Sequence, residues 1–175
     1  MLNIFPLFSI NGYRVNIKDW SKEHRDRILD LVPDVQKQTN MGSRIHYTDY
    51  YNDSIPPYQS ELMKVVSPYI EDFSKENGIN HIATLWCQKY KSGDYHSPHD
   101  HGSVGWSCVL YAKIDSDVHP STQFFPSFPD ETGCKKGKSF QVEEGDLIIF
   151  PAHLLHMAPP HYDDKMRIIF SFNLI

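Results

Sequence analysis

Six of the ten histidines fall into two tight clusters, and imidazole is the side chain that proteins most often use to bind a metal. The clusters are His96, His99 and His101, and His153, His156 and His161. An isolated histidine is more often a surface residue or a satisfied core residue, and we interpret His24, His46 and His81 in that way. Two clusters beside strand-like segments predict a metal site where the fold brings them together.

The spacing within the clusters selects three ligands. His99 and His101 are two residues apart, so on an extended chain both side chains point to one face, whereas Asp100 points to the other. His156 follows the strand-like run 146–150, whose end can lie opposite the first cluster in a jelly roll. Three ligands from one side leave adjacent octahedral positions open, as non-haem iron requires, although zinc also accepts three histidines and a water. The spacing predicts three ligands and leaves the metal open.

The last strand-like run carries a charged side chain on a buried face. Arg167, Ser171 and Asn173 share one face of residues 166–174, and the other face is entirely apolar. A buried charge is costly unless it is paired, and a dicarboxylic acid would give a guanidinium a bidentate partner. The alternative is that Arg167 lies at the rim of the sheet and pairs with an acid such as Asp163.

Two helices are predicted ahead of the strand-rich half of the chain. Asp19 or Ser21 can cap a helix that ends near Leu31, and a second helix with apolar residues at helical spacing ends at Gly78. Residues 39–57, between the helices, are polar and rich in Tyr, so we expect a long surface loop that could close over the site as a lid.

From residue 79 onward, β-branched and aromatic runs alternate with Gly, Pro and Asp. The candidate strands are 80–90, 105–115, 121–126, 138–142, 146–150 and 166–174. Short strands without helices between them predict an antiparallel barrel or sandwich. We therefore expect one α+β domain over residues 1–175: a helical support region at about 18–78, and a jelly-roll (double-stranded β-helix) core at about 79–175 with the helices packed on one face.

The whole-chain numbers exclude several classes of protein. A length of 175 residues, with 40% hydrophobic and 22% charged residues, fits one globular domain and not a disordered chain. The net charge of -5 and the lack of a long Lys/Arg run argue against extended nucleic acid as a partner. Residues 1–10 are too short for a membrane span and lack the basic start of a signal peptide. Three distant cysteines fit reduced thiols, so we expect a cytoplasmic protein.

The order of these motifs resembles that of the 2-oxoglutarate- and iron(II)-dependent oxygenases. The stretch Tyr90-x-x-Gly93-x-x-His96-x-x-His99-x-His101 is similar to the prolyl-hydroxylase-type segment Tyr-x-x-Gly-x-x-Tyr-x-x-His-x-Asp, and His156 and Arg167 follow in the family's order. The set spans residues 86–175 and looks most like that of small oxygenases from marine phages and bacteria. The resemblance implies that His99, His101 and His156 hold Fe(II) and that Arg167 pairs with the far carboxylate of the co-substrate 2-oxoglutarate.

One position departs from that pattern, because the family at large has Asp where this chain has His101. Three-His iron sites occur in the related cupins, which share the fold. The chain meets part of the cupin pattern as well, but Gly105 and Trp106 stand where cupins have a Glu. A cupin-type dioxygenase that does not use 2-oxoglutarate, or a non-catalytic metal-binding module, therefore remains as an alternative.

Several polar residues are candidates for the co-substrate pocket. Gln88 and Tyr90 share a face of the strand that leads into the first histidine cluster and could hydrogen-bond 2-oxoglutarate, as could Ser107 and Asn173 on later strands. Core positions with satisfied polar tips explain these residues equally well. We expect His96 to line the site without binding the metal.

The first hypothesis is an iron(II)- and 2-oxoglutarate-dependent dioxygenase, a hydroxylase that yields succinate and CO2. Its partner would be a small-molecule or side-chain substrate whose identity the sequence does not give, and a homodimer is left open. A phage-encoded enzyme of this kind would work in the host cytoplasm.

Overall fold

Two helices form the outer layer of the molecule. The computed structural model describes residues 9–34, 42–79 and 81–175. Helix α1 spans Lys22–Asp30 and is capped by Ser21, whose hydroxyl accepts a hydrogen bond from the backbone N–H of His24 at 3.3 Å. Helix α2 spans Gln59–Asn77 and ends at Gly78, which takes the left-handed conformation with φ +66°. Both helices were predicted, and Ser21 as the cap of α1 and Gly78 as the end of α2 are confirmed.

In the described ranges, nine strands form two antiparallel sheets. The larger sheet has the order β1-β7-β5-β9-β3-β2 and the smaller one the order β4-β8-β6. The bounds in the larger sheet are Tyr13–Asn16 (β1), Tyr47–Thr48 (β2), Ile82–Tyr90 (β3), Trp106–Lys113 (β5), Asp146–Pro151 (β7) and Arg167–Leu174 (β9). Those in the smaller sheet are His96–His99 (β4), Gln123–Phe124 (β6) and His156–Ala158 (β8). The two sheets form the double-stranded β-helix that the sequence predicted.

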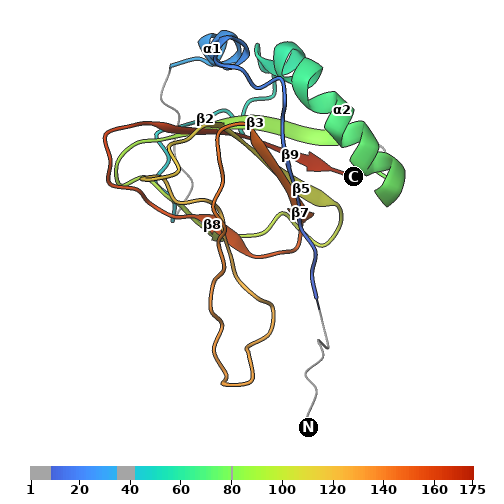
Figure 1. Cartoon of the computed structure of the whole chain (residues 1–175), viewed down its shortest axis with the longest axis vertical. Helices are drawn as coiled ribbons and strands as arrows, with labels where there is room; N and C mark the ends of the chain where they lie inside the picture. Colours follow the sequence, from blue (N-terminus) through green and yellow to red (C-terminus); the bar gives the residue numbers. More distant parts are fainter. Residues whose placement is uncertain (1–8, 35–41, 80) are drawn as a thin grey trace.

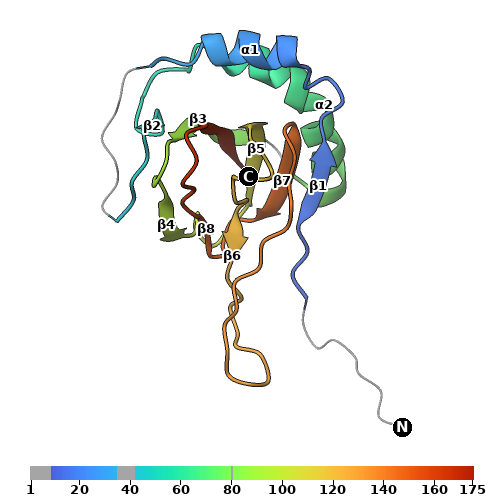
Figure 2. The same ribbon diagram turned by 60° about the vertical axis from the view of Figure 1, so that its left-hand side comes forward.

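The sheets and helices stack in layers. Figure 1 shows α1 and α2 over one face of the larger sheet, and Figure 2, which looks nearly along the barrel, shows β4, β8 and β6 facing the other side. Strand alternation divides the core accordingly. On β9, Phe170 and Phe172 belong to the core beneath the helices, while Ile169 joins Tyr90 and Tyr111 between the two sheets. The site described below lies in this second, inner space.

One predicted strand is absent, and two short strands that carry histidines were missed. Residues 138–142 form no strand, and only Lys138 makes a bridge, to Phe124. Strands β4 and β8 were not expected, because each is short and carries histidines in place of β-branched residues. They pair with each other, with His99 opposite His156, so the two histidine clusters themselves build the smaller sheet.

The segment before α2 is only in part the surface loop that its polar composition predicted, because residues 50–55 are exposed but residues 47–49 are buried. Tyr47 and Thr48 form β2 and pair with β3, and Asp49 is also buried. Its carboxylate accepts hydrogen bonds from the hydroxyl of Tyr58 and from the backbone N–H of Cys87, both at 2.7 Å. These partners lie 9 and 38 residues away, where a local pattern cannot reveal them. Residues 39–41 of the expected loop lie outside the described residues.

Candidate metal and co-substrate site

Three histidine side chains converge between the sheets. His99 lies at the end of β4, His156 at the start of β8, and His101 in the segment that leaves β4, where its backbone N–H donates to the carbonyl of Ala152 at 2.9 Å. One ring nitrogen from each of the three lies within 4.8 Å of the other two. Asp100 is exposed, and its carboxylate accepts the N–H of Gly102. The structure thus brings together the three predicted ligands and leaves Asp100 outside the group.

Each of the three rings is held by a hydrogen bond at Nδ1. The Nδ1 of His99 lies 2.7 Å from the carbonyl of Ser97, and the Nδ1 of His156 lies 2.8 Å from the carbonyl of Leu154. The Nδ1 of His101 lies 2.7 Å from the side-chain oxygen of Asn173. A carbonyl oxygen only accepts, so each Nδ1 carries the proton and each Nε2 keeps a free lone pair. This is the tautomer that a metal requires at Nε2.

Burial keeps these rings neutral. It lowers the pKa of His99 and of His101, and it lowers the pKa of His156 to about 3, with a further contribution from the neighbouring His99. Metal ligation needs the unprotonated imidazole, so the rings are in the correct charge state at neutral pH.

His96 stands beside the three-histidine group without joining it. Its ring stacks on that of His99 with centroids 3.8 Å apart, and its Nδ1 lies 3.3 Å from the amide nitrogen of Gln88. Burial lowers the pKa of His96 to about 3. These contacts fit the expectation that His96 lines the site.

Arg167 is buried near the other end of the inner space, with 2% of its surface exposed. Its guanidinium donates to the carbonyls of Pro120 and Pro159, at 2.8 and 3.0 Å, and lies 4.4 Å from the ring centre of Tyr90. Within the described part of the chain no acidic side chain forms an ion pair with it, Asp163 included. The structure therefore contradicts the alternative in which Arg167 lies at the rim of the sheet and pairs with an acid such as Asp163.

The hydroxyl of Tyr90 lacks a partner. It is buried, and among the described residues only Tyr90 Oη and His161 Nδ1 are buried side-chain atoms without a hydrogen bond. Desolvation by burial raises the pKa of Tyr90, so the hydroxyl stays protonated and can donate. A buried hydroxyl without a partner, on a ring that is covered by a buried guanidinium without an acidic partner, is an environment that suits a carboxylate.

The other candidates for the co-substrate pocket have partners within the protein. The oxygen of Asn173 accepts from His101 and from the hydroxyl of Ser107, the latter at 3.2 Å, and Gln88 contacts His96. Asn173 is thus turned toward His101, while Ser107 and Gln88 line the cavity between the sheets. Thr84, which accepts a hydrogen bond from the Asn173 amide at 3.0 Å, was missed, although it continues the face of alternate residues on β3.

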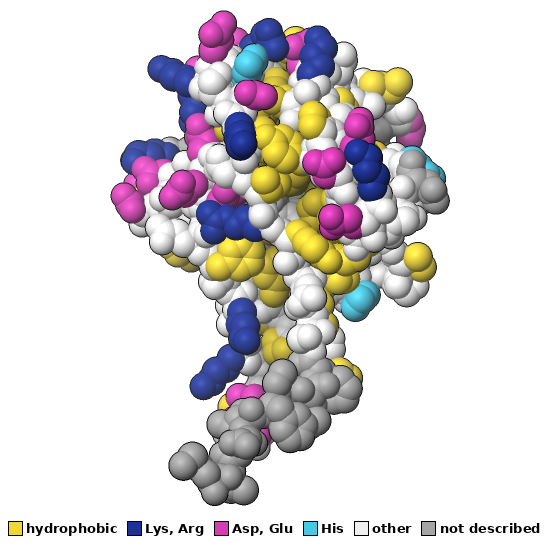
Figure 3. Space-filling view, turned by 45° about the vertical axis from the view of Figure 1, so that its right-hand side comes forward, with side chains coloured by type: hydrophobic (Ala, Val, Ile, Leu, Met, Phe, Trp, Pro, Cys, Tyr) yellow, Lys and Arg dark blue, Asp and Glu magenta, His cyan; other side chains and the backbone are white. Residues whose placement is uncertain are grey.

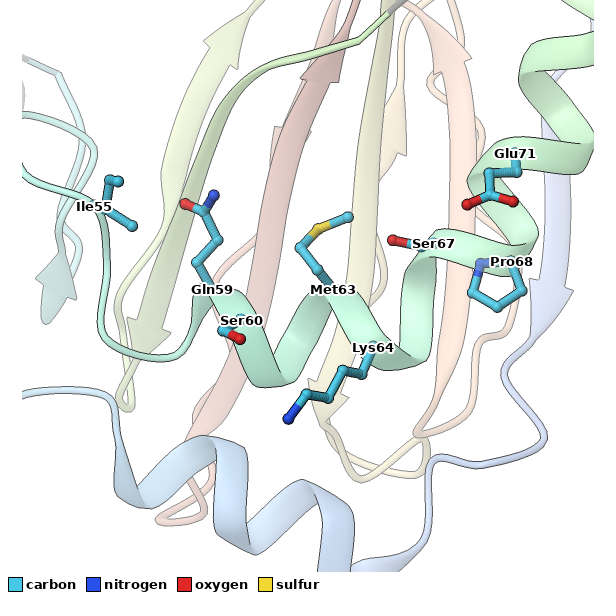
Figure 4. Close-up of a pocket in the computed structure, with 8 residues that line it drawn as sticks. All are labelled: Ile55, Gln59, Ser60, Met63, Lys64, Ser67, Pro68 and Glu71. Carbon is cyan, nitrogen blue, oxygen red and sulfur yellow. The ribbon is translucent and has the colours of Figure 1, made fainter.

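A narrow cavity lies between the histidines and Tyr90. Its volume is about 20 Å³, and its wall includes the three histidines, Tyr90 and Ser171. A larger hollow lies on the exposed side of α2, between Ile55 and Glu71 (Figure 4). That hollow carries no histidine and only Lys64 and Glu71 as charged groups, so it lacks the convergent polar atoms of a catalytic site.

Figure 3 shows acidic and basic side chains interspersed over the face in view, without a continuous basic stripe. None of the helices in the described ranges is long and apolar enough to span a bilayer.

The chain belongs to the 2-oxoglutarate–iron(II) oxygenase family. Residues 84–173, just over half of the chain, match the model of the family described as "Putative 2OG-Fe(II) oxygenase". The protein is accordingly an enzyme, a 2-oxoglutarate-dependent dioxygenase whose cofactor is Fe(II) and whose co-substrate is 2-oxoglutarate. The family match excludes the two alternatives, a cupin-type dioxygenase without 2-oxoglutarate and a non-catalytic module. No curated protein matches the sequence.

Solved structures share the fold at low sequence identity. The viral collagen prolyl hydroxylase of Paramecium bursaria Chlorella virus-1, solved with 2-oxoglutarate, is 16% identical, with 93% of this chain and 94% of that chain covered and a TM-score of 0.62. A prolyl hydroxylase of Trichoplax adhaerens, solved with a peptide of hypoxia inducible factor, is 15% identical over 94% of this chain and 83% of that chain, with a TM-score of 0.63. A Pseudomonas putida prolyl-4-hydroxylase is 12% identical over 94% and 92%, with a TM-score of 0.62.

Proposed function

We propose that His99, His101 and His156 hold the iron and that Arg167 and Tyr90 receive the distal carboxylate of 2-oxoglutarate. The proposal rests on two observations: one ring nitrogen from each of the three histidines lies within 4.8 Å of the other two, and the buried donors Arg167 and Tyr90 have no acidic partner in the described chain. Together, bound iron(II) and 2-oxoglutarate supply the family's chemistry, in which O2 oxidises a substrate while 2-oxoglutarate becomes succinate and CO2.

The protein's own residues would bind the iron and 2-oxoglutarate and hold them in position. The backbone carbonyls of Ser97 and Leu154 hold two imidazoles in the tautomer that presents Nε2, and burial keeps them neutral. The guanidinium of Arg167 donates hydrogen bonds to two backbone carbonyls, so its orientation is already fixed before a carboxylate binds. Tyr90 would add a second donor from the neighbouring strand.

The cavity wall must move to admit the co-substrate. A volume of about 20 Å³ holds about one water molecule. Met157 and Gln88 line the wall with unbranched side chains that can change rotamer at small cost. A closed inner space would also exclude bulk water around the reacting groups.

The substrate we propose is an aliphatic C–H group of a small molecule or of a protein side chain, which the enzyme would hydroxylate. The support comes from the solved relatives, whose names record prolyl hydroxylation, one of them of collagen. The three cysteines are free, two of them buried, which fits a reducing compartment such as the cytoplasm. Residues 1–175 would act as one domain.

An anaerobic titration with iron(II) and 2-oxoglutarate tests this assignment. We expect a weak visible charge-transfer band when both are present, its loss in His99→Ala, and a dissociation constant for 2-oxoglutarate that rises about 100-fold in Arg167→Lys, which keeps the charge but not the fork. The control is Arg27→Ala, since Arg27 is an exposed arginine paired with Glu61 on the helical layer.

The experiment tests the iron site and the carboxylate site separately. A band that persists in His99→Ala would contradict the iron site. A 2-oxoglutarate affinity that is the same in Arg167→Lys as in Arg27→Ala would contradict the carboxylate site.

A further inference from the structure

We infer that Asn173 is the positioning residue that lets this chain use a histidine where its family has an aspartate. The inference rests on the proposed function, because it takes His101 to be a metal ligand. An aspartate ligand has no N–H to satisfy. A histidine ligand brings an Nδ1–H that must find an acceptor, and here the acceptor is the Asn173 oxygen at 2.7 Å.

The three histidines differ in where that acceptor comes from. His99 and His156 each bond the carbonyl of the residue two positions earlier, so the backbone of their own strands fixes both rings. His101 lies beyond the end of β4 and bonds a side chain 72 residues away, on β9. Only the His101 tautomer therefore depends on a residue that substitution can remove.

The side-chain amide of Asn173 also makes hydrogen bonds to two side chains on neighbouring strands. Its oxygen also accepts from the hydroxyl of Ser107 on β5, and its nitrogen donates to the hydroxyl of Thr84 on β3. These strands flank β9 on both sides. The larger sheet thus aims the amide oxygen at the His101 ring, which belongs to the segment that leaves the smaller sheet.

The orientation of the amide and the tautomer of the histidine are coupled. With the oxygen toward His101, Nδ1 carries the proton and Nε2 is free for a metal. With the amide turned over, its NH2 group would face Nδ1, which would then have to be the acceptor, and the proton would move to Nε2 and block the metal. The structure has the first arrangement, in which the oxygen also accepts from the hydroxyl of Ser107.

The chemistry of the acceptor also sets the charge of the site. An amide is neutral, so the three-imidazole site gains no negative charge from its support, whereas a carboxylate at the same place would raise the basicity of His101. Asn173→Asp and Asn173→Ala should therefore change metal affinity in opposite directions.

The first test reads the tautomer in the metal-free protein by long-range 1H–15N NMR of the histidine rings. We expect the Nδ1–H form of His101 in the wild type, with Nε2 unprotonated, and a shift toward the Nε2–H form in Asn173→Ala. The matched control is Asn77→Ala, which removes an amide bonded to a backbone carbonyl at the end of α2. An unchanged His101 spectrum in Asn173→Ala would overturn the inference.

The second test is a double-mutant cycle with Co(II) as the probe. We expect Asn173→Ala to weaken Co(II) binding about 10- to 100-fold, Asn173→Asp to tighten it, and Ser107→Ala to weaken it less than Asn173→Ala. In His101→Asp, which has no imidazole to support, adding Asn173→Ala should change the affinity less than threefold.

The cycle separates this inference from the proposed function. Equal losses on removing Asn173 in the wild type and in His101→Asp would show that the amide only supports the sheet and would overturn the inference. If His99→Ala binds Co(II) as well as the wild type does, the metal site itself is wrong. If His101→Asp binds no Co(II), the cycle cannot be completed. The NMR measurement of the His101 tautomer in Asn173→Ala then tests the inference.

Discussion

Two buried tyrosines of the inner core differ in what their hydroxyls contact. The hydroxyl of Tyr111 accepts from the backbone N–H of Thr122 at 3.0 Å and lies 2.8 Å from its side-chain oxygen. The hydroxyl of Tyr90 has no partner. An unsatisfied buried hydroxyl destabilises the folded state, so its removal should leave stability unchanged or raise it by about 1 kcal/mol.

Tyr90→Phe therefore should separate stability from co-substrate binding. We expect no loss of stability in urea unfolding but a dissociation constant for 2-oxoglutarate that rises about 10- to 100-fold, since a hydrogen bond to a charged group is worth about 1.5–3 kcal/mol. Tyr111→Phe is the matched comparison and should cost about 1–3 kcal/mol of stability. Unchanged 2-oxoglutarate affinity in Tyr90→Phe would remove Tyr90 from the proposed site.

At the scale of single residues, the sequence revealed positions set by local alternation and missed those set by long-range contacts. The two-residue spacing of His99 and His101 was enough to place both on one face, and alternation on the last strand placed Arg167 on the inner face. The bond between His101 and Asn173 joins residues 72 apart, and no periodicity encodes it.

At the scale of elements, β2 depends on one buried carboxylate. Asp49 follows β2 and joins it to α2 through Tyr58 and to β3 through the N–H of Cys87. Asp49→Ala would leave both donors buried without an acceptor, and we expect it to cost about 2–4 kcal/mol in urea unfolding. Asp53→Ala, at an exposed position of the same segment, should stay within about 0.5 kcal/mol. Similar losses in the two variants would refute this role.

A buried histidine ties the turn after β5 to the segment that leads into β9. The Nδ1 of His119 accepts from the N–H of Asp115 at 3.0 Å, and its Nε2 lies 3.0 Å from the carbonyl of Lys165, to which it donates. Burial lowers the pKa of His119 below its ordinary value. The unfolded chain therefore binds a proton near pH 6.5 that the folded chain does not yet bind. The stabilisation that His119 provides is lost as the pH falls below about 6.5 toward the lowered pKa of the folded state.

His119→Leu should show this pH dependence. We expect it to cost about 1–3 kcal/mol in urea unfolding at pH 7.5, where both hydrogen bonds are lost, and clearly less at pH 5.5. His81→Leu, at an exposed position, should show no such difference between the two pH values. An equal cost of His119→Leu at both pH values would contradict the lowered pKa.

The elements were predicted from sequence where they bury a continuous apolar face. Strand β9 and helix α2 have such faces, and both were found within a few residues. Strands β4 and β8 have four and three residues, several of them histidines, and are stabilised by pairing with each other and by the cavity they enclose. Their function sets their sequence, so strand propensity could not reveal them.

At the scale of the whole molecule, the two sheets differ in what holds them together. The larger sheet has six strands and buries a core against each face, whereas the smaller sheet has three strands of two to four residues. Such short strands make few ladder hydrogen bonds and are marginal by themselves. A metal bound by His99 and His156 would join β4 to β8, so metal binding should stabilise the smaller sheet most.

Anaerobic thermal unfolding with and without Co(II) measures this contribution. A ligand that binds only the folded state at a concentration 100 times its dissociation constant adds about 2.7 kcal/mol, which for a chain of this size raises Tm by roughly 5–11 °C. His156→Ala should abolish the rise, and His81→Ala should retain it. Hydrogen exchange should show metal-dependent protection in 96–101 and 156–158 before it shows any in β3 or β9. Protection that rises equally in both sheets, or a Tm rise that survives in His156→Ala, would place the metal elsewhere in the molecule.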